Sequence, residues 1–251
     1  MPKISIIMPN YNGDKFLERA IVSFINSSWL NKELVIVDGK STDSSHTLIS
    51  KYVEKNKNII WLNNPDDGIS DAINIGLSYT SGDIIGYLGS DDLLLPDALH
   101  LVAQYWKLIP FDGLYFDSYT YDYKSNTTKY RNCPNVSFSV NNLLRYGTIV
   151  GLQNIFFASD IFKNYKYDVD NKYSMDYEFY LRILHKYRNF VHVKHPSSIN
   201  IAHDNITNSL ELKQTKEAFR VTKNYCTKLL SINSYYIYKR KFLNMLRRYN
   251  G

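Results

Sequence analysis

The sequence predicts an α/β protein built on a doubly wound, mostly parallel sheet. Two observations indicate this class: short apolar runs alternate with segments of helical periodicity over the first 110 residues, and turn-forming polar residues follow each run. Parallel strands need crossover connections, which helices supply, so helices are expected on both faces of the sheet. A chain of 251 residues is long enough to bury such a core.

The first part of the chain is expected to repeat the strand and helix pattern. Its strands are predicted at Lys3–Met8, Glu33–Val37, Asn58–Leu62 and Asp83–Leu88. Its helices are predicted around Phe16–Ile25, Leu48–Val53 and Ala72–Leu77, with a fourth from Pro96 to Leu108. The polar loops PNYNG, DGKSTDSS, DDGISDAIN and GSDD then fall at the carboxyl ends of the strands, where such sheets bind ligands.

Past residue 110 the alternation weakens, and a mixed half followed by C-terminal helices is expected. The predicted elements are a hairpin of Gly113–Tyr121 and Thr127–Arg131, a helix at Val140–Tyr146, a strand at Asn154–Ala158, a helix at Asp176–Lys186 and a strand at Phe190–His195. We therefore divide the chain into residues 1–110 and 111–205, as halves of a single domain, and a basic helical tail at 206–251.

The excess positive charge is confined to that tail, where ten Lys and Arg stand against two acids. Aromatic and basic residues are mixed there, which is typical of a helix on an anionic membrane surface; a packed helix with a solvated charged face is the alternative. No apolar run approaches the ~20 residues that span a bilayer, and no signal peptide is recognisable. We expect a cytoplasmic protein, peripheral on the inner membrane, that does not bind nucleic acid because no zinc-finger or RRM pattern is present.

Cysteine and histidine spacing favours no metal site. Cys133 and Cys226 lack CxxC spacing and are interpreted as packed, reduced thiols rather than metal ligands or a disulfide. Five histidines show no HExxH or similar spacing and are interpreted as structural: His46, His100, His185, His192 and His195.

Two adjacent acids after the fourth predicted strand indicate a different kind of metal site. Asp91 and Asp92 are hard oxygen ligands suited to Mg²⁺ or Mn²⁺, although either could simply begin the turn before Pro96. The sequence has neither GxGxxG nor GxxxxGK[ST], so a cation on Asp92 is the simplest way to neutralise a bound diphosphate. Asp38, after the second strand, is placed to contact a ribose or base.

The sequence resembles glycosyltransferase family 2, whose members are inverting enzymes of the GT-A fold that use nucleotide-diphosphate sugars. The segments SIIMPNYNG, LVIVDGKSTDSS, PDDGISDAINIGLSYTSGDIIGYLGSDD and SMDYEFYLRIL carry the resemblance, in the family's order and spacing. It implies transfer of a hexose or N-acetylhexosamine from a UDP-sugar, with Mn²⁺ or Mg²⁺, to a glycan or lipid-linked glycan in bacterial polysaccharide or lipopolysaccharide biosynthesis. Residues 1–110 would bind the donor and 111–205 the acceptor.

The resemblance also implies roles for individual residues in the donor site. Pro9 and Tyr11 would hold the uracil or ribose, Asp38 would bond the base, Asp91 the ribose and Asp92 the metal ion.

Asp176 would be the catalytic base that takes the proton of the acceptor hydroxyl, because a single inverting displacement needs a base and no carboxylate nucleophile. Glu178 is the second candidate, and from the residues alone an N-cap of the helix is the favoured interpretation of Asp176.

Three further positions are suggested by the same resemblance. His203 would be a third metal ligand or a phosphate contact, with a surface loop histidine as the alternative. Asp71 would contact the donor, or act only as a first-turn helix acid. Gln153 would lie near the acceptor. Ile73 stands where many relatives carry a phosphate-contacting arginine, and Asp38-Gly39-Lys40 replaces a pair of acids.

Two other functions remain compatible with the pattern. A catalytically silent member of the fold would bind a nucleotide sugar or glycan, or scaffold a membrane assembly. A nucleotidyltransferase would need a basic phosphate loop after the first strand, and PNYNG is not one.

Overall fold

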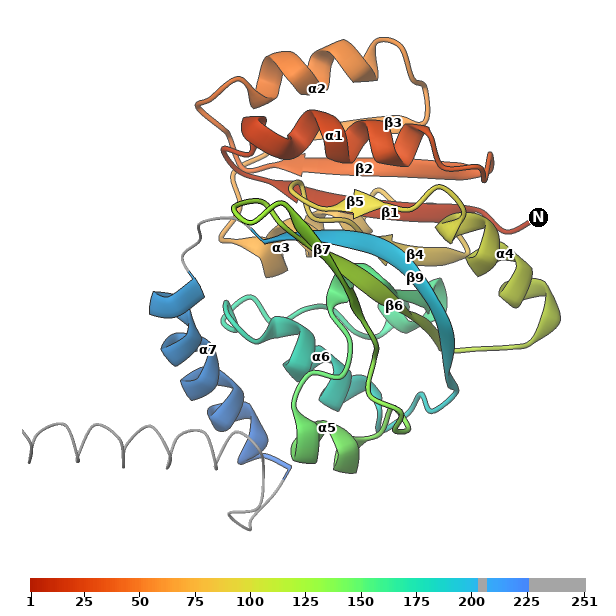
Figure 1. Ribbon diagram of the computed structural model, residues 1–251, viewed down its shortest axis with the longest axis vertical. Helices are drawn as coiled ribbons and strands as arrows, with labels where there is room; N and C mark the ends of the chain where they lie inside the picture. The colour runs from red at the N-terminus through yellow and green to blue at the C-terminus, as the bar shows by residue number, and fades with distance from the viewer. Residues whose placement is uncertain (203–206, 226–251) are drawn as a thin grey trace, which may run out of the picture. The chain divides into compact units, whose positions relative to one another are not determined.

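The computed structural model describes residues 1–202 and 207–225 of the chain (Figure 1). Among these, one compact unit contains residues 1–133, 150–169 and 189–202, and a second contains residues 134–149, 170–188 and 207–225. Each unit therefore combines segments that are far apart in the sequence. The division at residues 110 and 205 stays a prediction.

Four parallel strands of the first unit form the predicted part of the sheet, in the order β3-β2-β1-β4 (Figure 1). These strands are β1 (Ile4–Asn10), β2 (Lys32–Asp38), β3 (Ile59–Asn63) and β4 (Ile84–Tyr87). The helices between and after them are α1 (Asp14–Ile25), α2 (Ser45–Val53), α3 (Ile69–Leu77) and α4 (Ala98–Leu108). The predicted α/β class is confirmed.

Helices cover both faces of this parallel region. One core cluster joins alternate residues of β1, such as Ile6, to α1, α2 and α4. On the opposite face, Val35 and Val37 of β2 pack with Ala72 of α3. Because both faces are covered, β2 is buried along its whole length, as parallel strands are in doubly wound folds. A ligand pocket can therefore form only from the loops at the ends of the strands, as is usual in doubly wound sheets.

The remaining strands build the predicted mixed half around β6. β6 is antiparallel to β7 and β8 and parallel to β9, and β8 is antiparallel to β4. The short strand β5 is antiparallel to β9. Their bounds are β5 (Leu93–Leu94), β6 (Gly113–Asp122), β7 (Thr127–Arg131), β8 (Ile155–Ala158) and β9 (Phe190–Ala202), with 3₁₀ turns η1 (Leu152–Asn154) and η2 (Ser159–Lys163) beside β8.

The first strand extends through Pro9, where the sequence predicted a turn. The ladder between β1 and β4 ends at the pair Ile7 and Tyr87, and Leu88 N donates to Ile7 O just beyond it. The backbone N–H and C=O groups of successive residues of β1 point in turn to the neighbouring strand on one side and on the other. Ile7 bonds toward β4, so Pro9 also faces that side, beyond the point where the ladder with β4 ends. The missing N–H of proline therefore removes no hydrogen bond.

Other predicted boundaries in this unit shift for non-local reasons. β9 runs past the predicted end at His195 to Ala202 because its later residues pair with β6 after a bulge. The two-residue strand β5 was not predicted, since it is too short to show a pattern. Pro96 precedes α4, whose N-cap is Asp97, instead of occupying the first helical position.

The second unit is helical. It contains α5 (Val140–Tyr146), α6 (Met175–Ile183) and α7 (Thr207–Thr222). α5 has the predicted bounds, and its N-cap Ser139 accepts a hydrogen bond from Asn142 N. Phe138 packs edge to face on Tyr180 of α6, with ring centroids 5.1 Å apart. In the described ranges, no helix combines the length and the apolar character needed to cross a membrane.

Candidate active site

The loops after β1 and β2 are locked together by side chain to backbone hydrogen bonds. Asn12, in the left-handed region with φ 50°, accepts from Thr42 N at 2.8 Å through its Oδ1, while its own N–H donates to Ser41 Oγ at 2.8 Å. Asp14 N donates to Asp43 Oδ2 at 3.0 Å. Polar residues of this kind tolerate or create tight turns. The edge of the sheet formed by the ends of β1 and β2 is thus held in a defined shape.

Asp38 lies at the centre of this arrangement, with none of its surface exposed. Its carboxylate accepts from Asn10 Nδ2 at 2.8 Å and from Ser41 Oγ at 2.5 Å, and His46 Nε2 lies 2.8 Å from its Oδ2. His46 in turn stands edge to face on Trp61. The structural interpretation of His46 fits this place. Asp38 ties the two loops together.

The aromatic ring expected to contact the base is exposed at the same edge. Tyr11 has 66% of its surface exposed, and Pro9 is half-buried at the end of β1. Gly39 lies beside the ring, because a Cβ there would stand 3.4 Å from Tyr11 Cδ2. A planar base could stack on such a ring.

Asp66 is an acid of this site that the sequence analysis did not single out. A Cβ at Gly39 would lie 2.7 Å from Asp66 Oδ2, so the carboxylate sits directly over Gly39 and needs the absence of a side chain there. Burial and the nearby carboxylates of Asp71 and Asp38 raise the pKa of Asp66. The signal that could have found it was its place in the loop after the third strand.

The acid pair follows β4 as predicted. A Cβ at Gly89 would lie 2.9 Å from both Asp91 Oδ1 and Asp92 Oδ2, so the two carboxylates converge on the same glycine. Asp92 Oδ1 also accepts from Ile201 N at 3.1 Å. Burial, and then the like charge of Asp91, raise the pKa of Asp92 to about 7. A divalent cation would relieve this repulsion.

The loop after β1 passes directly beside the acid pair. A Cβ at Gly13 would stand 3.1 Å from Ser90 Oγ and even closer to the amide of Asn10. Asn10 is nearly fully buried and bonded to Asp38. The first unit therefore brings the predicted residues Pro9, Tyr11, Asp38, Asp91 and Asp92 to neighbouring loops of a single sheet edge.

Two of the three weaker suggestions, Asp71 and Gln153, lie within the described residues. Asp71 lies in the first turn of α3 and accepts from Asp67 N at 3.1 Å, as a helix acid does. Ile73 is only 3% exposed and belongs to the core, so this chain presents no side chain to phosphate there. Gln153 is half-buried in η1. His203 lies outside the described residues.

The second unit contains Asp176, which lies in the first turn of α6. Its Oδ1 accepts from Tyr177 N at 2.7 Å. Burial raises the pKa of Asp176 to about 6 in spite of this hydrogen bond. A carboxylate with such a pKa is a stronger base than an exposed aspartate and is still ionised at neutral pH.

The second candidate base, Glu178, is already engaged. Both of its oxygens accept from Arg182 one turn later, at 2.7 Å from Nε and 2.8 Å from Nη2. A forked pair of this kind occupies both oxygens of the carboxylate and fixes its position. Asp176 remains the better candidate.

A residue of α7 holds the loop that precedes α6. Glu217 accepts from the backbone N–H groups of Lys172, Tyr173 and Ser174 at 3.0, 2.6 and 2.8 Å. This carboxylate therefore positions the start of the helix that carries Asp176. It was missed because its partners are 43 to 45 residues away in the sequence.

A doubly wound sheet with polar loops and an acid pair at the carboxyl ends of its strands is the arrangement that the expected GT-A fold requires. The chain belongs to the family described as glycosyl transferase family 2, whose profile matches residues 5–174. The predicted family is confirmed.

Known proteins resemble the chain over different lengths. A chondroitin synthase of Pasteurella multocida (strain Pm70) is 35% identical over 104 residues, which are 41% of this chain and 11% of the synthase. The chain spans less than half the length of several curated relatives that it matches, 40% of one and 11% of another.

Solved structures share the fold at low sequence identity. S. aureus TarS 1–349 in complex with UDP-GlcNAc has a TM-score of 0.67 at 17% identity, covering 87% of this chain and 65% of that one. The mannosyltransferase PcManGT from Pyrobaculum calidifontis, in complex with GDP-Man and Mn²⁺, has a TM-score of 0.69 at 14% identity, covering 93% and 67%. These likenesses show a common GT-A fold.

Proposed function

We propose that the protein is a metal-dependent, inverting glycosyltransferase that moves a hexose or N-acetylhexosamine from a UDP-sugar to a glycan or lipid-linked glycan. The observation that carries the proposal is the convergence of Asp91 and Asp92 on Gly89, at the loop edge of a family 2 fold. The exposed Tyr11 ring beside this edge supplies a surface for the base.

The donor set of the acid pair fits a hard divalent cation. Two carboxylates in a partly buried place, with the pKa of Asp92 raised to about 7, favour Mg²⁺ or Mn²⁺ over a softer metal. Asp92 would bind such a cation, and Asp91 would either help to bind it or contact the ribose. The cation would neutralise the negative charge of the departing diphosphate. The Mn²⁺ complex of PcManGT supports a cation in this fold.

The donor base is assigned to Tyr11, Pro9 and the acids near Gly39. Asp38 is fully buried, so its role in this proposal is to order Asn10 and Ser41. Asp66, which lies over Gly39, has a half-buried carboxylate that would contact the base or the ribose. The UDP-GlcNAc complex of TarS supports a uridine donor.

The chemistry requires one base. The Asp176 carboxylate takes the proton of the acceptor hydroxyl, whose oxygen bonds to the anomeric carbon as the bond from that carbon to the diphosphate breaks. The pKa of Asp176, about 6, keeps the group ionised at neutral pH and basic enough to accept the proton. Attack opposite the leaving group inverts the configuration.

The acceptor is proposed to be a glycan or lipid-linked glycan of bacterial surface polysaccharide or lipopolysaccharide biosynthesis. The match to a chondroitin synthase, a polysaccharide-forming protein by name, supports this class. We place the reaction at the cytoplasmic face of the inner membrane, approached through the basic tail, of which residues 226–251 lie outside the described ranges.

The test combines binding and turnover. UDP binding is measured by calorimetry with Mn²⁺, with Mg²⁺ and with chelator, and UDP release is followed with a panel of UDP-sugars and with GDP-mannose. We expect cation-dependent UDP binding and donor-selective release, both lost in Asp92→Ala and kept in Asp160→Ala, which removes an exposed acid paired with Lys163. UDP binding that is equal with chelator and in Asp92→Ala would overturn the metal assignment.

A catalytically silent member of the fold is the alternative. Such a protein would bind UDP or a UDP-sugar with the same cation dependence but would release no UDP with any donor and glycan acceptor. Its binding would be unchanged in Asp176→Asn.

A further inference from the structure

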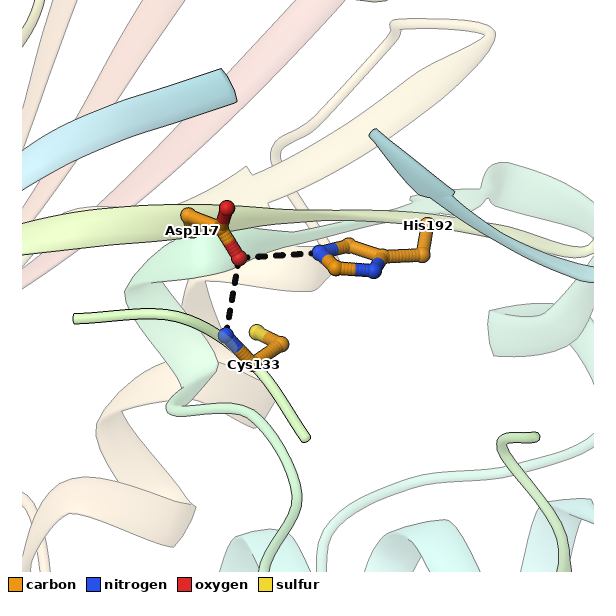
Figure 2. A group of neighbouring side chains, drawn as sticks. All are labelled: Asp117, Cys133 and His192. Atoms are coloured by element: carbon orange, nitrogen blue, oxygen red, sulfur yellow. Dashed lines mark hydrogen bonds and ion pairs between the residues drawn. The ribbon is translucent and has the colours of Figure 1, made fainter. Parts of the chain in front are cut away.

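Three metal-ligand side chains converge in the first unit, away from the acid pair in the sequence. Ligand atoms of Asp117, Cys133 and His192 all lie within 4.8 Å of one another (Figure 2). Asp117 Oδ1 is 2.9 Å from His192 Nε2 and accepts from Cys133 N at 2.8 Å. None of these contacts serves the proposed glycosyl transfer.

The fold aims these side chains at one point. Asp117 stands in β6 at a bulge, where the register with β9 shifts between Phe116 and Asp117 and again before Ser118. Bulges redirect side chains in this way. His192 comes from β9 and Cys133 from the segment after β7, so three separate stretches of chain meet.

The site is sheltered from solvent. The Asp117 side chain is 3% exposed and that of His192 is 15% exposed, while Cys133 is half-buried. The His192 ring stacks on Tyr115, with centroids 4.9 Å apart and planes 4° from parallel. Rings fixed in this way lose little freedom when they bind an ion.

The second oxygen of Asp117 has an outer hydrogen-bond partner of the kind that supports a metal ligand. Tyr130 Oη donates to Asp117 Oδ2 at 2.8 Å, leaving Oδ1 on the side of His192 and Cys133. Hydrogen bonds to the second oxygen of a carboxylate orient the first toward a metal and tune its basicity.

The chemistry of the three groups selects the ion. A thiolate and an imidazole together favour Zn²⁺, whereas Mg²⁺ and Mn²⁺ prefer oxygen ligands. The negative charges of one carboxylate and one thiolate also cancel the charge of a divalent cation, which lowers the cost of holding it in a sheltered place.

We propose that Asp117, Cys133 and His192 form a Zn²⁺ site that is separate from the acid pair of Asp91 and Asp92. Zn²⁺ binding breaks the S–H bond of Cys133, which donates to Phe116 O in the metal-free protein, forms the Zn–S bond and releases the proton to solvent. His192 gives up the Nε2 proton that faces Asp117 Oδ1 and takes one from solvent on Nδ1, so that the neutral ring binds through Nε2. A water molecule would complete the fourth position.

Burial, and then the negative Asp117, raise the pKa of Cys133 to about 12 in the metal-free chain. The thiol is therefore protonated and a poor nucleophile without metal, which argues against a redox or catalytic role for it. Metal binding supplies the charge that makes the thiolate favourable.

The experiment uses Co²⁺ as a spectroscopic substitute for Zn²⁺. Full-length protein, freed of metal by chelator, is titrated with Co²⁺ and read for a thiolate-to-cobalt charge-transfer band, then with Zn²⁺, which should displace it. We expect the band in the unmodified chain and in Asp92→Ala, because the acid pair has no sulfur ligand. We expect it to vanish in Cys133→Ser and to remain in Cys226→Ser, the matched cysteine control.

Thermal unfolding distinguishes the site from a hydrogen-bonded network. Zn²⁺ should raise the Tm of the unmodified chain and of Cys226→Ser but not that of Cys133→Ser or His192→Ala, whose folding is checked by circular dichroism. No charge-transfer band in the unmodified chain, or a band that depends on Cys226, would overturn the proposal. Asp92→Ala is expected to keep the Zn²⁺ site and to lose UDP binding. Failure of the Zn²⁺ proposal and failure of the proposed transferase function can therefore be told apart.

Discussion

Asp38 and Asp176 are both acids that the sequence placed in the active site, yet their surroundings are opposite. Asp38 has no exposed surface, and its carboxylate contacts the side chains of Asn10, Ser41 and His46. Asp176 remains partly exposed, and in the described part of the chain its carboxyl is bonded by backbone N–H groups and by no side chain.

The difference separates a structural acid from a reactive one. Side-chain hydrogen-bond partners make a buried carboxylate part of the fold, and removing it leaves those partners unsatisfied. Burial raises the pKa of Asp176, and a raised pKa is what a general base needs. The two acids should therefore respond to substitution in opposite ways.

The largest effect is expected at Asp176. Asp176→Asn should lower kcat by about 10²–10⁴-fold, the usual contribution of a general base. UDP binding should be unchanged, because the donor loops belong to other segments. Steady-state UDP release with a competent donor and acceptor measures this, with Glu178→Gln as the neighbouring control. A loss in Glu178→Gln as large as in Asp176→Asn would contradict the assignment.

The same pair of acids should differ in stability. Asp38→Ala leaves the amide of Asn10 and the hydroxyl of Ser41 without their acceptor, and should lower the free energy of unfolding by about 3 kcal/mol. Chemical denaturation measures it, with the surface variant Asp160→Ala as control. A decrease in the free energy of unfolding no larger than that of Asp160→Ala would show that Asp38 does not stabilise the two loops.

Asp176→Asn should change stability in the other direction at neutral pH. The pKa of Asp176 is raised in the folded chain, so its ionised form costs folding free energy as the pH rises from about 4 to about 6 and above. Asparagine removes that cost. Denaturation of both proteins at pH 7 and at pH 4 should show the variant more stable at pH 7, with the difference shrinking at pH 4. Equal stability at both pH values would contradict the raised pKa.

The smallest effect is the pH dependence of the rate. Because the base must be ionised, kcat should rise by about tenfold for each pH unit below 6 and level off above it. Saturating Mn²⁺ is needed so that protonation of Asp92, whose pKa is raised to about 7, does not dominate the profile. A flat profile from pH 5 to pH 8 would show that Asp176 is not the base.

Sequence reasoning worked best where structure repeats locally. The strands and crossover helices of β1 to β4 follow from periodicity and turn residues, and the acid pair from its place after β4. The family prediction from the quoted motifs is confirmed by the profile match. The roles assigned to Asp71, Asp91 and Asp176 stay predictions.

The features that sequence reasoning missed depend on distant partners. Glu217 holds a loop 43 residues or more before it, and His192, interpreted as structural, meets an aspartate 75 residues away. Asp66 was part of a recognised loop, but only its position over Gly39 shows that it shares a site with Tyr11.

The sequence alone determined the α/β class and the alternating order of strand and helix, because hydrophobic periodicity and turn residues act over a few neighbouring positions. The family followed from the resemblance of its motifs, which the family match confirms. Tertiary structure decided which acids are buried, which carry raised pKa values and which side chains meet. These properties depend on desolvation and on charges brought together from separate segments, and no local pattern encodes them.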